Sequence, residues 1–153
     1  MLVFAPLSPA DLADWATTGR RDVWGFAATG SFLDAFGLPA HDSEDADLTL
    51  LELAGIAGLL AHGVRLVAVC DAPDAVGVEP AEFGCVTAAS VAWARVESLF
   101  ADDDEGAARA ASVRTALGAV TIDEAWDADA TSDLLRSTEL LWHGSTEWEG
   151  LSH

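Results

Sequence analysis

The feature that most constrains the fold is the apolar run Val64–Ala72, with the sequence VRLVAVCDA. His62 and Gly63 close the segment before it, and Pro73 turns the chain after it. A mostly apolar run of this length, bounded by turn residues, is typical of a strand in the interior of a sheet. We therefore expect this run to be the central strand of a sheet against which the rest of the chain packs.

The segment just before this strand, Ala46–His62, predicts a helix, because its apolar residues recur at three- and four-residue spacing. A helix that is apolar nearly all round is either buried on both flanks or part of an oligomer interface. Gly55 and Gly58 each cost about 1 kcal/mol in a helix interior. We expect them to allow close packing on the Val64–Ala72 strand. Four carboxylates lie before or within the first turn of this helix, where the helix dipole favours negative charge. We therefore interpret them as a helix start and not as a metal site; they are Asp42, Glu44, Asp45 and Asp47.

Local signals predict the remaining elements. Ser8 with Asp11, and Thr121 with Glu124, have the spacing of helix capping boxes. Strands are expected at 2–5, 22–28 (interrupted by Gly25), 82–88 and 96–101, and helical segments at 9–17, 31–36, after 102–105 and after 121. Residues 139–143 fit either a last strand or a helix end. The prediction is one α+β domain, 1–143, with a mixed sheet of about five or six strands and helices mainly on one face, followed by a partly ordered tail, 144–153.

Charge limits the partners of the chain. The net charge is −19, from 26 acidic residues against seven basic ones, all arginine. Lys, Asn, Gln and Tyr are absent, which favours a GC-rich genome over a salt-adapted acidic surface as the origin of this composition. Such a chain is not expected to bind nucleic acid directly, since that binding rests on basic groups that displace counterions, nor an anionic membrane. Its field favours basic partners, cations or simple solubility, and solubility is the plainest of these three interpretations.

The chain has room for a single domain with a substantial core, since it has 153 residues and 51% hydrophobic composition. Its start lacks the basic region of a signal peptide, and its apolar spans are too short for a membrane helix. We expect a soluble cytoplasmic protein. Cys70 and Cys85 lie in apolar runs, which predicts buried free thiols. A disulfide is the alternative if their strands are neighbours.

Motifs for catalysis or cofactor binding are absent. We find no paired ligands at metal spacing, no nucleophile elbow and no glycine-rich phosphate loop. No catalytic residue, metal or cofactor is therefore predicted. The candidate binding residues are Asp71 and Asp74 after the central strand, Asp102 and Asp103 after the 96–101 strand, and Trp142. Ordinary turn and helix-capping roles compete with function for the four aspartates, and core packing or anchoring of the tail competes for Trp142.

Two classes of function fit these observations. The favoured one is a non-enzymatic interaction or regulatory module that binds a basic protein, with mimicry of phosphates as a narrower version, or forms a homodimer through the 46–61 helix or a sheet edge. The alternative is a small metal-dependent hydrolase that uses Asp71, Asp74, Asp102 and Asp103. That alternative requires the two strand ends to converge.

Several stretches together resemble a known family. They are MLVFAP at the start, DLTLLELA, VRLVAVCDAPDAV, VAWARVESLFADD and the closing ELLWH. In order and spacing they are similar to an uncharacterised family of short acidic actinobacterial proteins, a domain of unknown function. The resemblance covers most of the chain. It implies an actinobacterial cytoplasmic protein and supplies no activity or catalytic residues.

Overall fold

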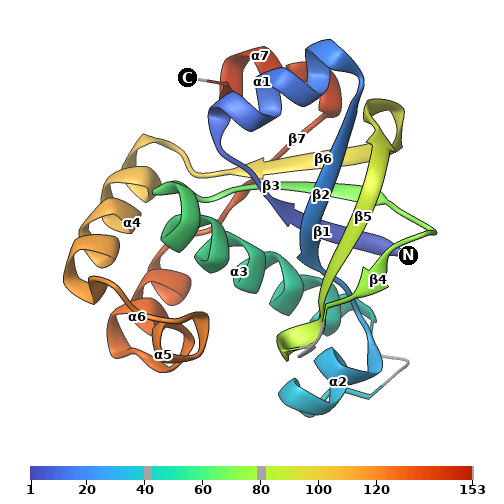
Figure 1. Cartoon of the computed structure of the whole chain (residues 1–153). Helices are drawn as coiled ribbons and strands as arrows, with labels where there is room; N and C mark the ends of the chain where they lie inside the picture. The colour runs from blue at the N-terminus through green and yellow to red at the C-terminus, as the bar shows by residue number, and fades with distance from the viewer. Residues whose placement is uncertain (40–42, 79–81, 153) are drawn as a thin grey trace.

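The computed structural model describes residues 1–39, 43–78 and 82–152. They form one α+β domain with a seven-stranded sheet and seven α-helices (Figure 1). The strands are β1 (Leu2–Pro6), β2 (Arg20–Phe26), β3 (Leu66–Asp71), β4 (Val76–Gly77), β5 (Cys85–Ala92), β6 (Val96–Ala101) and β7 (Leu141–His143). The helices are α1 (Pro9–Thr18), α2 (Gly30–Phe36), α3 (Ser43–His62), α4 (Asp104–Leu117), α5 (Ile122–Asp127), α6 (Asp129–Ser137) and α7 (Trp148–Leu151), with the 3₁₀ turns η1 (Glu82–Gly84), η2 (Trp93–Arg95) and η3 (Ser145–Glu147).

The sheet has the order β4-β5-β2-β1-β3-β6-β7. The predicted α+β class is confirmed, and β3 pairs with β1 and β6 in the interior of the sheet, as expected for a central strand. The sheet differs from the prediction in being antiparallel at every described pairing and in having seven strands. The additional strand β4 has two residues, too few for a period-two pattern to be visible in the sequence.

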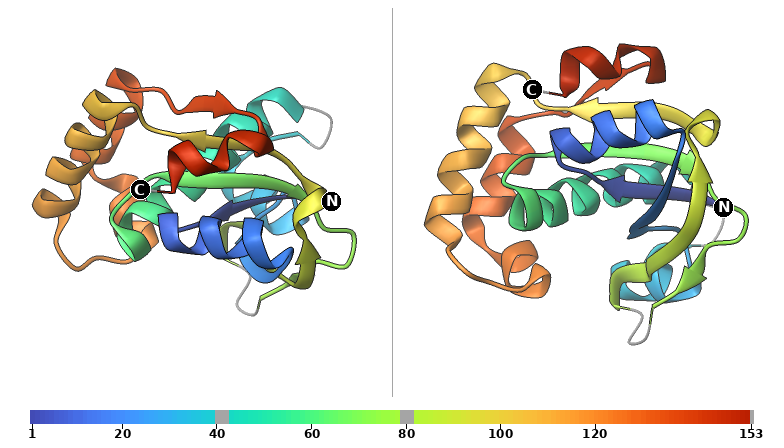
Figure 2. Two further views of the ribbon diagram at one scale, coloured as in Figure 1. Left: turned by 90° about the horizontal axis from the view of Figure 1, so that it is seen from above. Right: turned by 45° about the horizontal axis from the view of Figure 1, so that its top comes forward.

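Side chains of β3 alternate between two cores on opposite faces of the sheet. Leu66, Ala68 and Cys70 join the core beneath α1, whereas Val67 and Val69 join the core beneath α3. Most helices lie on the α3 side, where α4, α5 and α6 pack against α3 through a third cluster. The views in Figure 2 show α1 and α7 together on the other face. Both faces of the central strand are therefore buried.

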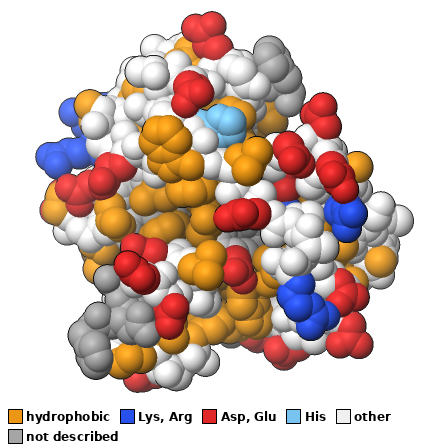
Figure 3. All heavy atoms as spheres, turned by 180° about the vertical axis from the view of Figure 1, so that it is seen from behind, with side chains coloured by type: hydrophobic (Ala, Val, Ile, Leu, Met, Phe, Trp, Pro, Cys, Tyr) orange, Lys and Arg blue, Asp and Glu red, His pale blue; other side chains and the backbone are white. Residues whose placement is uncertain are grey.

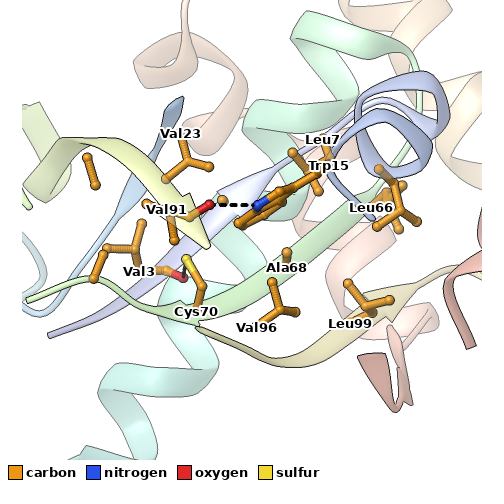
Figure 4. Close-up of a cluster of buried hydrophobic side chains, with 14 of the residues drawn as sticks. Val3, Leu7, Trp15, Val23, Leu66, Ala68, Cys70, Val91, Val96 and Leu99 are labelled. Atoms are coloured by element: carbon orange, nitrogen blue, oxygen red, sulfur yellow. Dashed lines mark hydrogen bonds between the residues drawn. The ribbon is translucent and has the colours of Figure 1, made fainter. Parts of the chain in front are cut away.

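The core beneath α1 is organised around Trp15, which is fully buried. Its indole Nε1 donates a hydrogen bond to the Val91 carbonyl at 2.9 Å (Figure 4). Its ring also contacts the Trp93 ring edge to face. A buried indole needs such a partner, because an unpaired N–H inside the core carries the full desolvation cost. This bond ties α1 to β5 across the sheet.

Local capping signals predicted helix starts well. The Ser8 side chain accepts a hydrogen bond from the Asp11 amide, and the Asp11 carboxylate accepts one from the Ser8 amide, so the predicted capping box is confirmed. Thr121 likewise caps α5. The predicted strand at 82–88 is shifted, because η1 occupies its first residues and β5 begins at Cys85. The alternative left open for 139–143 resolves as strand β7.

Helix α3 is apolar nearly all round because it is covered within the chain. The residues between Leu53 and Leu59 are buried, one side facing the sheet and the other facing α4 to α6. A Cβ placed on Gly58 would lie 3.3 Å from the Val64 carbonyl oxygen. One placed on Gly55 would lie 3.6 Å from Arg65 Cδ. The predicted close approach of these glycines to the chain entering β3 is confirmed. Asp42, part of the predicted acidic helix start, lies outside the described residues.

The C-terminal residues 144–152 form η3 and α7. Trp148 and Leu151 pack against the core beneath α1. The last residue of the predicted tail, His153, lies outside the described part of the chain. No helix in the described residues combines the length and apolarity required to cross a membrane.

Gly25 gives a direct test of the packing between β1 and β2. A Cβ at this position would lie 2.3 Å from the Phe4 carbonyl oxygen, a contact that backbone atoms cannot accept without moving. We expect Gly25→Ala to lower the free energy of unfolding by at least about 2 kcal/mol. Gly30→Ala is the matched control, because a Cβ there meets nothing within 4 Å. Denaturant unfolding that shows equal stability for both variants would contradict this packing.

Candidate functional site

A cavity of about 520 Å³ opens between α3, β6 and the chain that links α6 to β7. We call it the α3–β6 cavity. Its lining residues are Leu48, Leu51, Glu52, Arg65, Phe100 and residues 135–140. Figure 3, which shows the molecule from behind, has a hollowed band of hydrophobic side chains with carboxylates around it. The cavity arises because α3 packs on β1, β2 and β3 and leaves the β6 side of the sheet uncovered.

Arg65, which lines the cavity, forms a buried ion pair with Asp102. The side chains of Arg65 and Asp102 are only 2% and 5% exposed. Arg65 Nε donates to Asp102 Oδ2 at 2.9 Å, and Arg65 Nη2 donates to Asp102 Oδ1 at 2.5 Å. The same Nη2 donates to Thr138 Oγ1 at 2.8 Å. The pair therefore joins the start of β3, the end of β6 and the segment that leads into β7.

Asp102 and Asp103 have different roles although both follow β6. The Asp103 carboxylate caps α4 by accepting the Gly106 amide at 2.7 Å, as predicted for this acidic run. The Asp102 carboxylate instead points inward to Arg65. Sequence reasoning missed Arg65. The available signal was a single charge inside an apolar strand, which must find a buried partner.

The buried pair predicts a large and asymmetric mutational effect. Asp102→Ala leaves the Arg65 guanidinium buried without its partner, so we expect the free energy of unfolding to fall by about 3–5 kcal/mol. The double variant Arg65→Met with Asp102→Leu should recover most of that loss, because no charge is then buried. Denaturant titration measures both quantities.

The surface pair of Arg136 and Asp133 is the matched control. It has the same 2.5 Å separation, but its side chains are 74% and 72% exposed. We expect Asp133→Ala to cost less than about 1 kcal/mol. If Asp102→Ala costs no more than Asp133→Ala, the buried pair does not hold the three segments together.

Glu52 projects from α3 into the cavity and is half-buried. Burial raises the pKa of its carboxyl group, and the nearby Arg65 opposes that shift without cancelling it. A raised pKa in the folded state means that the folded chain holds this proton more tightly than the unfolded chain does. The contribution of Glu52 to stability is thus largest below its unfolded pKa and is lost as pH rises through the folded pKa.

The Glu52→Gln variant tests this assignment. We expect it to unfold with a higher free energy than the wild type at about pH 7.5, by less than about 1 kcal/mol, and the difference should shrink toward about pH 5. Glu149→Gln removes one charge from an exposed position and serves as the control. The burial of this carboxylate would be contradicted if Glu52→Gln raised the free energy of unfolding only as much as Glu149→Gln does. An increase that grows as the pH falls would contradict it as well.

Asp71 and Asp74 lie at the other end of β3. Asp71 contacts the N-terminal amine at 3.2 Å and Arg95 at 3.4 Å, and both aspartates line a small cavity of about 190 Å³. Because β3 and β6 run antiparallel, Leu66 faces Ala101, and Asp71 is five residues, or roughly 17 Å, away along the strand. The two strand ends do not converge, so Asp71 and Asp74 cannot share an ion with Asp102 and Asp103. No metal-binding group of three or more such side chains occurs among the described residues.

Trp142 lies on β7, the last strand of the sheet, and is 63% exposed. Its cross-strand partner on β6 is Phe100, which lines the α3–β6 cavity. Directly opposed residues of an antiparallel pair share a face. Trp142 is therefore on the same side of the sheet as the cavity, and it extends the apolar surface to the edge strand.

The backbone of Trp142 points away from the sheet. The Leu7 amide donates to the Leu66 carbonyl, and the Ala72 amide donates to the Met1 carbonyl. The backbone N–H and C=O groups of the even-numbered residues of β3 therefore point to β1. Backbone N–H and C=O groups alternate in direction along an antiparallel strand, so those of the odd-numbered residues of β3 point to β6 and pair there with even-numbered residues. The N–H and C=O groups of the odd-numbered residues of β6 therefore point to β7. Leu141 and His143 then pair with β6, whereas the N–H and C=O of Trp142 face the free edge.

The two cysteines lie on different strands and different faces. Cys70 is in the core beneath α1, and Cys85 contacts the core beneath α3. Strands β1 and β2 separate β3 from β5, which places the thiols roughly 14 Å apart. The disulfide alternative is therefore wrong, and both thiols are free. Burial raises the pKa of the Cys70 thiol to about 12, with Asp71 and Glu97 adding to the effect, so this thiol is unreactive.

A family model matches residues 1–151, from β1 through α7. The chain belongs to the family of unknown function DUF6912. The predicted resemblance to a domain of unknown function is confirmed at this level. No curated protein and no solved structure gives a significant match to the chain. DUF6912 membership therefore brings no activity to the cavity or to the β7 edge, and the function must be argued from their geometry.

Proposed function

We propose that this DUF6912 protein is a non-enzymatic interaction module that docks a basic protein partner on its α3–β7 face. This face comprises the α3–β6 cavity and strand β7. The observation that carries the proposal is Trp142, a large aromatic side chain that is 63% exposed beside an apolar hollow. Exposed tryptophans beside apolar pockets are typical of the energetic centres of protein interfaces.

Charge supports a basic partner. Five of the seven arginines, at positions 21, 65, 95, 109 and 136, already form ion pairs within the chain, so few basic groups are left to balance the charge of −19. Glu139 and Glu147 flank β7 in the sequence and are exposed. A partner with basic groups gains from this field, whereas a second copy, also at −19, is repelled by it.

The other versions of an interaction role have less support. A homodimer through α3 would need an uncovered helix face, and most of the apolar surface of α3 is covered within the chain. Mimicry of phosphates would need rows of carboxylates on one face. The acidic side chains instead project from α1 on one side and from α3, α4, α5 and α6 on the other.

The setting of this role is part of the proposal. A GC-rich actinobacterial source fits the absence of Lys, Asn, Gln and Tyr and the resemblance described above. A cytoplasmic location fits the two free thiols, which a reducing compartment keeps unpaired.

Affinity capture from a lysate of the source organism tests the proposed surface. The baits are the wild type, Trp142→Ser, and Val76→Ser as the matched control, since Val76 is 61% exposed but lies on β4 at the opposite end of the sheet. We expect the wild type and Val76→Ser to retain the same basic protein, and Trp142→Ser to retain at least about tenfold less. Moderate salt should also weaken the capture.

Quantitative mass spectrometry of the eluates decides the outcome. Equal capture of every partner by all three baits would place the interaction surface elsewhere. Partners that depend on Trp142 but carry a net acidic charge would contradict the electrostatic part of the proposal.

A further inference from the structure

We propose that the partner binds by β-strand addition, with an extended basic segment pairing along the free edge of β7 and placing a lysine or arginine over Trp142. The inference rests on the proposed function and names its mode of recognition. It predicts that main-chain hydrogen bonds as well as side chains hold the partner.

The edge of β7 has the backbone geometry that strand addition needs. Among the described strands only β6 pairs with β7, and the N–H and C=O of Trp142 point away from β6. The next outward amide, that of Gly144, already donates to the Glu147 carboxylate at 2.6 Å. Trp142 therefore offers the free donor and acceptor at the centre of β7, and an added strand would centre on this residue.

Side-chain alternation fixes what an added strand would present. The residue directly opposite Trp142 would lie on the same face as the indole and Phe100, next to the α3–β6 cavity. Its two neighbours would point to the other face, where Leu141 is exposed. Alternate residues of the added segment thus contact different faces of the sheet. The face that carries the Trp142 indole is the more distinctive of the two.

Charge and the indole select the occupant. A cation above an exposed tryptophan ring gains from the electron density of the ring, and the exposed Glu139 and Glu147 precede and follow β7 in the sequence. A second copy of the chain could pair edge to edge in geometry. It would bring the same carboxylates and two charges of −19 together, which disfavours it. The observations therefore favour an extended basic segment from another protein.

A library of eight-residue peptides provides the probe. Alternate positions are lysine or arginine, and the other positions vary over apolar residues. Fluorescence anisotropy with the full chain should identify binders. Each binder is then made in two N-methylated forms, one blocking the amides on one edge of the extended peptide and one blocking the amides on the other. We expect one form to lose affinity at least about tenfold while the other keeps it, because only one edge can face β7.

Variants of Trp142 separate the indole from the backbone. Trp142→Val keeps the outward N–H and loses the ring, so binding should weaken by about tenfold. Trp142→Pro also removes the N–H, and it should fold because this amide does not pair with β6. We expect it to bind more weakly than Trp142→Val. If Trp142→Pro does not fold, the methylated peptides carry the test alone.

The outcomes distinguish the two proposals. Binding that both methylated forms retain would overturn strand addition and leave docking on the α3–β7 face intact. Failure of every basic peptide to bind the wild type, or equal binding of glutamate-substituted peptides, would overturn both. Self-association of the chain at micromolar concentration, abolished in Trp142→Pro, would show that a second copy is the occupant.

Discussion

The buried ion pair of Arg65 and Asp102 is the interaction on which the functional face depends. It lies where β3 begins and β6 ends, and through Thr138 it also holds the segment that enters β7. Removing two charges from water is costly. The attraction between the charges offsets that cost only when their geometry is good and their hydrogen-bond donors are satisfied. The two-point contact of guanidinium and carboxylate meets that requirement. Together with the antiparallel pairing of the two strands, it positions β7 against β6.

The same arrangement explains why a hollow and an open edge occur together. Helix α3 covers β1, β2 and β3, and α6 turns into β7 only after the anchor at Thr138. Phe100 and Trp142 consequently lie between α3 and the edge of the sheet, beyond the strands β1, β2 and β3 on which α3 packs. In a protein interior, neighbouring side chains would fill such a hollow. That this one is lined by leucines and bordered by carboxylates fits a surface that is completed by a partner.

Local sequence signals predicted much of the fold and little of this site. Ser8 with Asp11 and Thr121 with Glu124 set helix starts through neighbours three residues away, so the sequence alone revealed them. The Arg65–Asp102 pair joins residues 37 positions apart, and no local pattern encodes it. Asp102 was instead attributed to the acidic start of α4, a role that belongs to Asp103. The two strand ends were considered as one site, but only the antiparallel register could show that they lie far apart.

Trp142 illustrates the same limit in a different way. An aromatic residue near the C-terminus is a candidate contact residue from the sequence alone. The sequence of a three-residue strand does not reveal which of its edges is free. That conclusion came from the hydrogen-bond alternation carried from β1 through β3 and β6 to β7. Strand addition at β7 therefore depends on the direction in which the Trp142 amide points.

Amide hydrogen exchange of the unbound chain measures that direction. If Trp142 faces a free edge, its amide should exchange at least roughly tenfold faster than those of Leu141 and His143, which pair with β6. Exchange at Trp142 as slow as at these two neighbours would mean that its N–H is already bonded, and would contradict an open β7 edge.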